Sequence, residues 1–196
     1  MRLLSFLAMM SFSCALTAAE FQLPDFALGT AKAEMKADVL ARTSVTVFES
    51  EAKIYPVWAE DKLAALQLSF YQGADYATLR QKTTVLLQQL TTQFGAISWV
   101  SAEANPASAV TPEQQLGLLD QVMKTAAETV AGYKQSHLAN STLVLDFQPT
   151  PQPDNSRLHL TISYSSISAE YRLELFVDDK KAPERTSGAI VNLEAF

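Results

Sequence analysis

The side chains best suited to acid–base or metal chemistry in this chain are its two histidines, His137 and His159. Imidazole titrates near neutral pH and is the commonest metal ligand in proteins. His137 comes at the end of a predicted long helix, where the helix dipole favours a cation, so a structural role is enough to explain it. His159 lies in a predicted strand and is the better candidate for chemistry.

The neighbours of His159 depend on how the predicted strands pair. If Leu145 lies opposite Leu160, then Asp146 faces His159 on the outward side of the sheet, with Glu174 nearby. Such a pair could orient a general base of a hydrolase or, with Glu174, hold a divalent metal. Opposite charges also face each other on exposed sheets without any catalytic role, and no positioned nucleophile or oxyanion loop accompanies this pair. Asp146 and His159 are therefore the only catalytic candidates, and we expect no metal and no cofactor.

Motifs that bind nucleotides, activate a serine or hold zinc on a helix do not occur in the sequence. It contains neither G-x-S-x-G nor H-E-x-x-H. Its six glycines are spread from Gly29 to Gly188, so no glycine-rich loop can surround a phosphate. The sequence favours a protein that acts by binding over one that acts by catalysis.

Aromatic side chains on two predicted strands are the binding candidates. Tyr55 and Trp58 lie close to Pro56, which cannot donate a ladder hydrogen bond, so their strand belongs at a sheet edge or is interrupted there. An edge strand can accept a partner strand, or the chain's own N-terminal segment can cover it. Phe176 falls on the predicted outward face, in the same cross-strand row as His159. We take Tyr55, Trp58 and Phe176 as candidate anchors for a partner protein.

The first nineteen residues have the pattern of a secretory signal peptide. Arg2 precedes an uncharged apolar run that is too short to remain as a membrane-spanning helix, and small residues follow it up to Ala19. We expect cleavage near Ala19 and a secreted or periplasmic mature protein. Cys14 allows a second interpretation, in which it is the lipid-bearing first residue of a lipoprotein. The residues before it match a lipoprotein signal less closely than Thr17 to Ala19 match an ordinary cleavage site.

Charge and cysteine content limit the partners of the mature chain. The full sequence has a formal net charge of −6 and one cysteine, Cys14. Removal of residues 1–19 takes away one positive charge and that cysteine, which leaves an acidic chain without disulfides or a thiolate nucleophile. An acidic surface repels phosphate backbones, so we expect no nucleic-acid partner. A hydrophobic content of 48% is that of a chain with a real core.

The rest of the chain divides into two halves, 20–100 and 111–196, joined by a small, polar linker at 101–110, and we expect them to form one compact domain. Helical patterns cover 30–42, 76–94 and 111–138. Strand patterns cover 44–48, 53–58, 63–71, 96–100, 141–147, 157–165, 171–177 and 188–195.

These patterns predict an α+β fold, in which two long helices pack on one face of an antiparallel sheet. The last four strands form a meander with one apolar face. No transmembrane span is expected in the mature chain. The function that fits is an interaction or accessory protein of the cell envelope. A carrier of a small apolar ligand, held between the second long helix and the meander by Met123, Tyr133 and Tyr164, is the alternative.

Overall fold

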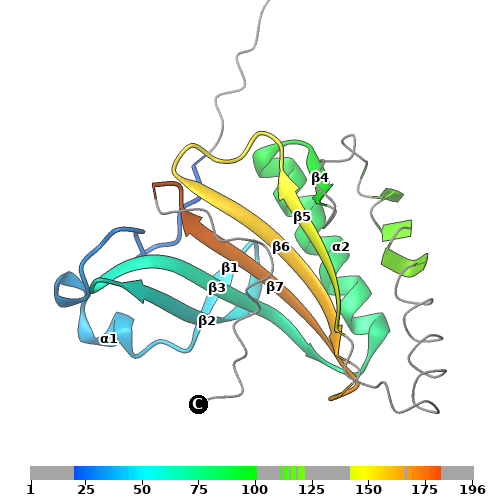
Figure 1. Cartoon of the computed structure of the whole chain (residues 1–196), viewed down its shortest axis with the longest axis horizontal. Helices are drawn as coiled ribbons and strands as arrows, with labels where there is room; N and C mark the ends of the chain where they lie inside the picture. Colours follow the sequence, from blue (N-terminus) through cyan, green and yellow to red (C-terminus); the bar gives the residue numbers. More distant parts are fainter. Residues whose placement is uncertain are drawn as a thin grey trace, which may run out of the picture.

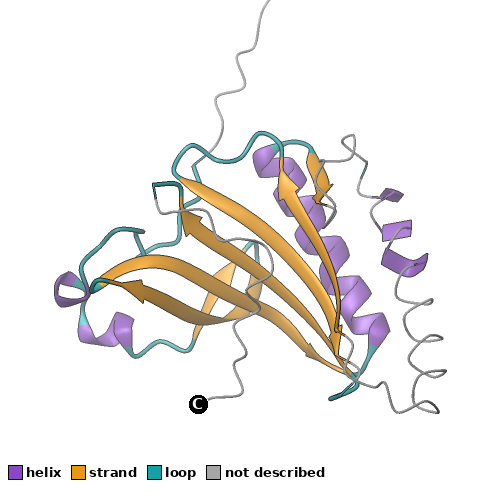
Figure 2. Ribbon diagram, viewed as in Figure 1, coloured by secondary structure: helices purple, strands orange, loops and turns teal. Residues whose placement is uncertain are grey.

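The computed structural model describes residues 20–100, 111, 113–114, 116–117, 119–121, 142–165 and 167–181 (Figures 1 and 2). The predicted linker at 101–110, most of the second long helix and the predicted strand at 188–195 lie outside these residues. So do His137, Met123 and Tyr133.

One seven-stranded antiparallel sheet forms the centre of the molecule. Its spatial order is β1-β2-β3-β7-β6-β5-β4, and it curves around a single apolar core (Figure 1). The strands are β1 (Ser44–Val47), β2 (Ser50–Ala59), β3 (Lys62–Gly73), β4 (Ile97–Val100), β5 (Thr142–Pro149), β6 (Ser156–Ser165) and β7 (Glu170–Asp179). Because β3 pairs with β7, strands from both halves of the chain share this sheet. The α+β class is confirmed.

The alternation of the predicted meander is confirmed on β5, β6 and β7. One face is buried in the core and consists of Leu145, Phe147, Leu158, Leu160, Ile162, Leu173, Leu175 and Val177. The residues between them point to the opposite face, as a side-chain period of two requires. We call this second face, which is turned away from the core, the outer face.

The helix α2 (Tyr76–Phe94) has the bounds that the sequence predicts, and it packs against β3, β4, β5 and β7. Asp75 caps its N-terminus: its carboxylate accepts hydrogen bonds from the backbone N–H groups of Ala77 at 3.1 Å and Thr78 at 3.2 Å. Gly95 ends it with a φ of 86°, a left-handed conformation that glycine adopts without strain. Its buried stripe is Leu79, Thr83, Leu86, Leu87, Leu90 and Phe94.

The predicted helix at 30–42 is wrong. The structure has only a 3₁₀ turn, η1 (Lys32–Glu34), and the single-turn α1 (Ala37–Leu40). The backbone here pairs with the start of β3: Lys32 donates to the carbonyl of Asp61 at 2.7 Å, and Leu63 donates to that of Thr30 at 2.9 Å. These tertiary hydrogen bonds hold residues 30–32 beside β3 and prevent one continuous helix, although the segment has a high helix propensity.

The start of the second long helix is described in part. Thr111 and Gln114 form the reciprocal hydrogen bonds of a capping box, which confirms Thr111 as the predicted N-cap. Leu116 and Leu119 are buried in the core. The prediction that this helix crosses the sheet falls on residues outside those described. Among the described residues, no helix is long and apolar enough to cross a membrane.

Candidate binding face

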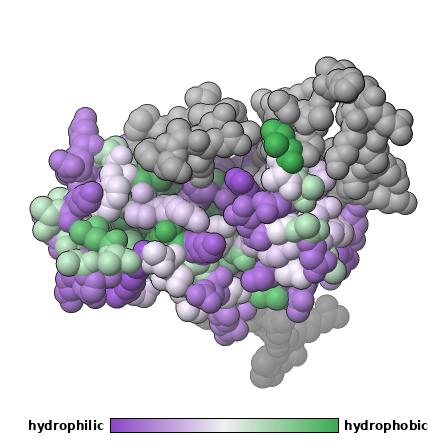
Figure 3. Space-filling model, turned by 90° about the horizontal axis from the view of Figure 1, so that it is seen from below, coloured by the Kyte–Doolittle hydropathy of each residue, from purple (hydrophilic) through white to green (hydrophobic). Residues whose placement is uncertain are grey.

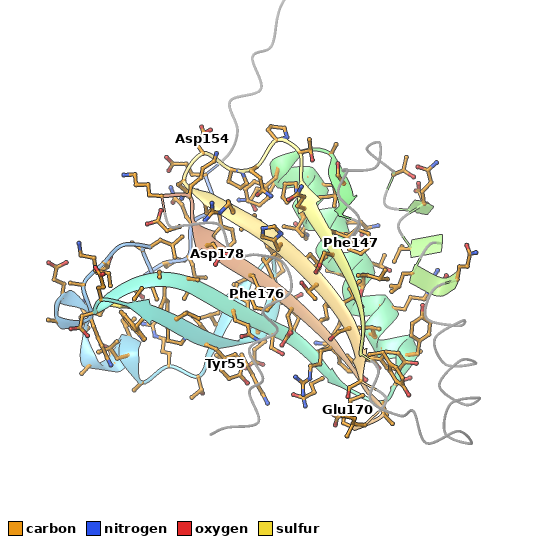
Figure 4. The ribbon with its side chains drawn as sticks, in the orientation of Figure 1. Tyr55, Phe147, Asp154, Glu170, Phe176 and Asp178 are labelled. Atoms are coloured by element: carbon orange, nitrogen blue, oxygen red, sulfur yellow. The ribbon has the colours of Figure 1, made fainter. Side chains whose placement is uncertain are left out.

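The outer face of the sheet aligns three of the candidate residues in one cross-strand row. Tyr55 on β2 lies opposite Gln67 on β3, Gln67 opposite Phe176 on β7, and Phe176 opposite His159 on β6. Adjacent strands are about 4.8 Å apart, so the row extends across roughly 15 Å. We call these four residues the outer row. Figure 4 shows Tyr55 and Phe176 on their separate strands of this sheet.

The outer row mixes exposed aromatic surface with polar groups. Tyr55 is 45% exposed, and the other three side chains are half-buried by their neighbours on the sheet. Gln67 donates through Nε2 to Oε1 of Glu174, at 2.9 Å, in the next row. This bond fixes the orientation of one amide and one carboxylate beside Phe176. Aromatic rings surrounded by positioned polar groups are the composition that protein interfaces favour.

The expected Asp146–His159 pair does not form, because the register of β5 on β6 differs from the one that we inferred. Leu145 lies opposite Ile162, so Asp146 lies opposite Thr161 and accepts a hydrogen bond of 2.7 Å from its hydroxyl. A slip of two residues leaves every side chain on its own face, and alternation alone cannot detect it.

The connection between β5 and β6 explains the register that is observed. The side chain of Gln152 accepts from the N–H of Leu158 at 2.8 Å and donates to its carbonyl at 3.1 Å. Lys180 donates through Nζ to the carbonyl of Pro153 at 2.9 Å. The connection is thus fastened to the start of β6 and the end of β7. Within the described residues no group of three or more acidic, histidine or cysteine side chains is arranged to hold a metal.

Trp58 does not join the outer row. Trp58 is three residues along the strand from Tyr55, so it points to the opposite face, where it packs against the core. A β-bulge between Val57 and Trp58 shifts the pairing of the two strands, and Trp58 lies opposite Leu63. Nζ of Lys32 lies 5.5 Å from the centre of its ring, in a cation–π contact. The structure therefore separates Trp58 from Tyr55 and Phe176. The side-chain period of two along a strand already places Tyr55 and Trp58 on opposite faces.

The strand with Pro56 is a sheet edge over only part of its length. β1 pairs with residues 50–53 of β2, and from Tyr55 to Ala59 no described strand lies on that side. The N–H of Ile54 points outward, to the carbonyl of Thr43 at 3.0 Å. Pro56 comes two residues later, so its backbone nitrogen faces the same side as that of Ile54. The absence of an N–H at Pro56 therefore affects the open edge and removes no hydrogen bond from the ladder with β3. The prediction that the strand with Pro56 lies at a sheet edge is thus correct for residues 55–59. The proline makes this edge poorly suited to pairing with another strand.

Hydrophobic side chains are exposed close to this open edge. Seen from below, they gather at the left end of the molecule, where Figure 1 places α1 and β2 (Figure 3). Leu40 of α1 is 37% exposed. Tyr55 belongs both to the open part of β2 and to the outer row. The open part of β2 and the outer row thus adjoin each other through Tyr55.

Sequence reasoning missed a polar cluster that joins α2 to Asp120. Asp120 accepts a hydrogen bond from Tyr76 at 2.7 Å and two from the guanidinium of Arg80, at 2.8 and 3.0 Å. The Arg80 hydrogen bond is the main cause of a lowered pKa of Asp120, to which Tyr76 also contributes. Burial, and then the hydrogen bond to Asp120, raise the pKa of Tyr76. The opposite charges of Arg80 and Asp120 were visible in the sequence, but their contact was not.

This cluster borders a group of tyrosines, whose tilted rings contact one another at the same end of the sheet. The ring of Tyr171 lies 5.5 Å from that of Tyr76 and 4.8 Å from that of Tyr164. Burial raises the pKa of Tyr171. The rings close the core beside the start of α2, so we assign this group a structural role.

Comparisons with known proteins give no relative on which to base a function. No protein family matches the chain, and no curated protein or solved structure is significantly similar to it.

Proposed function

We propose that this protein is a secreted or periplasmic binding module, which docks a partner protein of the cell envelope on its outer row. The observation that carries the proposal is the alignment of Tyr55, Gln67, Phe176 and His159 across four strands. Strands hold side chains in fixed positions, so a partner meets a surface that needs little ordering on binding. The signal-peptide pattern of residues 1–19 supports the compartment.

The hydrolase hypothesis has lost its main support, because Asp146 bonds to Thr161 and not to His159. We therefore propose no reaction.

The experiment is photo-crosslinking in the envelope of the producing cell, with a photoreactive amino acid in place of Tyr55. We expect a defined cross-linked partner, whose recovery falls about tenfold or more when Phe176→Ala is added, since central aromatic anchors dominate interfaces. Val85→Ala is the matched control, because Val85 is 39% exposed but lies on α2, away from the outer row. Equal recovery from the Phe176→Ala and Val85→Ala proteins would refute the proposal.

A further inference from the structure

The ladder between β2 and β3 ends before β3 does. Its last pair is Lys53 with Ser69, whereas β3 continues to Gly73 and pairs with Tyr171 of β7 on its other side. A bulge between Ser69 and Tyr71 occurs at the point of separation. From Phe70 onward, one edge of β3 has no strand beside it among the residues that the structure describes.

A groove of about 360 Å³ opens at this separation. Its walls come from β2, β3 and α2, and its lining residues are Glu51, Lys53, Ser69, Phe70, Tyr71, Gln72 and Lys82. The aromatic side chains of Phe70 and Tyr71 belong to the core or pack against it. The groove thus combines aromatic surface with polar side chains from three elements.

Two lysines give the groove a cationic character in a chain whose net charge is −6. Lys53 enters it from β2 and Lys82 from α2. In the part of the chain that the structure describes, no ion pair joins Glu51 to either lysine. Two ammonium groups at one groove attract a carboxylate, and they do so most strongly at low ionic strength.

We propose that this groove binds an extended peptide segment that carries an acidic side chain. The peptide runs along the free edge of β3 beyond Ser69, where every second residue of the strand directs its N–H and C=O groups toward the groove. Its carboxylate lies between Lys53 and Lys82, and an apolar side chain contacts the partly exposed ring of Tyr71. This site goes beyond the outer row, because it takes its affinity from backbone pairing and from the two lysines.

The probe is a six-residue peptide of alternating valine and threonine with one central glutamate, fluorescently labelled at its N-terminus. Binding is measured by fluorescence anisotropy at low salt with the mature wild-type protein. We expect saturable binding, and an affinity about tenfold lower both for the same peptide with glutamine in place of glutamate and for the Lys53→Glu/Lys82→Glu protein. Amide chemical shifts should change at residues 70–73.

Lys36→Glu/Lys62→Glu is the matched control. It makes the same change of charge at exposed lysines outside the groove and should leave the affinity within about twofold of wild type. The proposal is overturned if the peptide does not bind at millimolar concentration, if the glutamine peptide binds equally well, or if the two double variants bind alike. It is also overturned if decanoate binds with the same lysine dependence and the peptide does not. If the peptide does not bind the groove, the crosslinking test of Phe176 still decides the proposed function of the outer row.

Discussion

At the scale of single residues, the hydroxyl of Tyr76 joins two parts of the chain that are 44 residues apart. It donates to Asp120, and its ring packs at a tilt against that of Tyr171. Because the hydrogen bond is partly buried and its acceptor is charged, removal of the hydroxyl leaves Asp120 with one donor fewer. The bond is thus a local test of whether Asp120 is docked on α2 in solution.

We predict that Tyr76→Phe lowers the free energy of unfolding by about 1 kcal/mol, the usual contribution of one hydrogen bond. Urea denaturation followed by circular dichroism measures the change. Tyr55→Phe is the control, since its exposed hydroxyl should contribute almost nothing. Equal stability of the two variants would contradict the docking of Asp120 on α2.

At the scale of elements, two carboxylates stabilise α2: Asp75 caps its N-terminus, and Asp120 pairs with Arg80 on its first turns. The side-chain hydrogen bond from Thr78, followed by the backbone bond from Ala77, lowers the pKa of Asp75. The hydrogen bond from Arg80 does the same for Asp120. A lowered pKa in the folded state means that ionisation of each group stabilises the fold.

We predict that this stabilisation is present above the ordinary carboxyl pKa of 3.8 and is lost as the pH falls through the lower folded values. Thermal unfolding between pH 7 and pH 2.5 measures it. Asp120→Asn should unfold at a lower temperature than wild type at pH 7, and the difference should shrink in acid. Asp154→Asn, at an exposed position, serves as the control. A difference that persists undiminished at pH 2.5 would contradict this account.

At the scale of the whole molecule, the pairing of β3 with β7 makes one sheet from two halves of the chain. Leu175 of β7 is fully buried and lies opposite Leu68 of β3 and Leu160 of β6. Its side chain therefore contributes to a core that neither half can complete alone. Such an arrangement predicts that both halves unfold together.

We predict that Leu175→Ala lowers the free energy of unfolding by about 2–5 kcal/mol, as expected for a large-to-small change in a packed core. Tryptophan fluorescence and far-UV circular dichroism should still give coincident urea transitions. Leu40→Ala, at an exposed site, should change the stability by less than about 0.5 kcal/mol. Separate transitions for the two probes would show that the halves unfold independently.

The sequence by itself determined the features that depend on neighbours along the chain. Asp75, the apolar stripe that follows it and Gly95 were enough to bound α2, because a helix forms its hydrogen bonds within its own segment. Alternation placed Phe176 and His159 on one face and Leu160 and Leu175 on the other, because side chains along a strand alternate with a period of two.

Only the tertiary structure decided the features that depend on contacts between distant segments. The backbone bonds of Lys32 and Leu63 outweighed a helical composition, and a bulge shifted the pairing of β2 with β3 by one residue. The slip that separates Asp146 from His159 left every side chain on its own face, so the pattern gave no sign of it. Strand register and bulges are set by the summed packing and hydrogen bonding of partner strands. Those partners are unknown until the chain has folded. For this reason the sequence predicted the pairing of Phe176 with His159, but the extension of the outer row to Gln67 and Tyr55 and the groove beside β3 appear only in three dimensions.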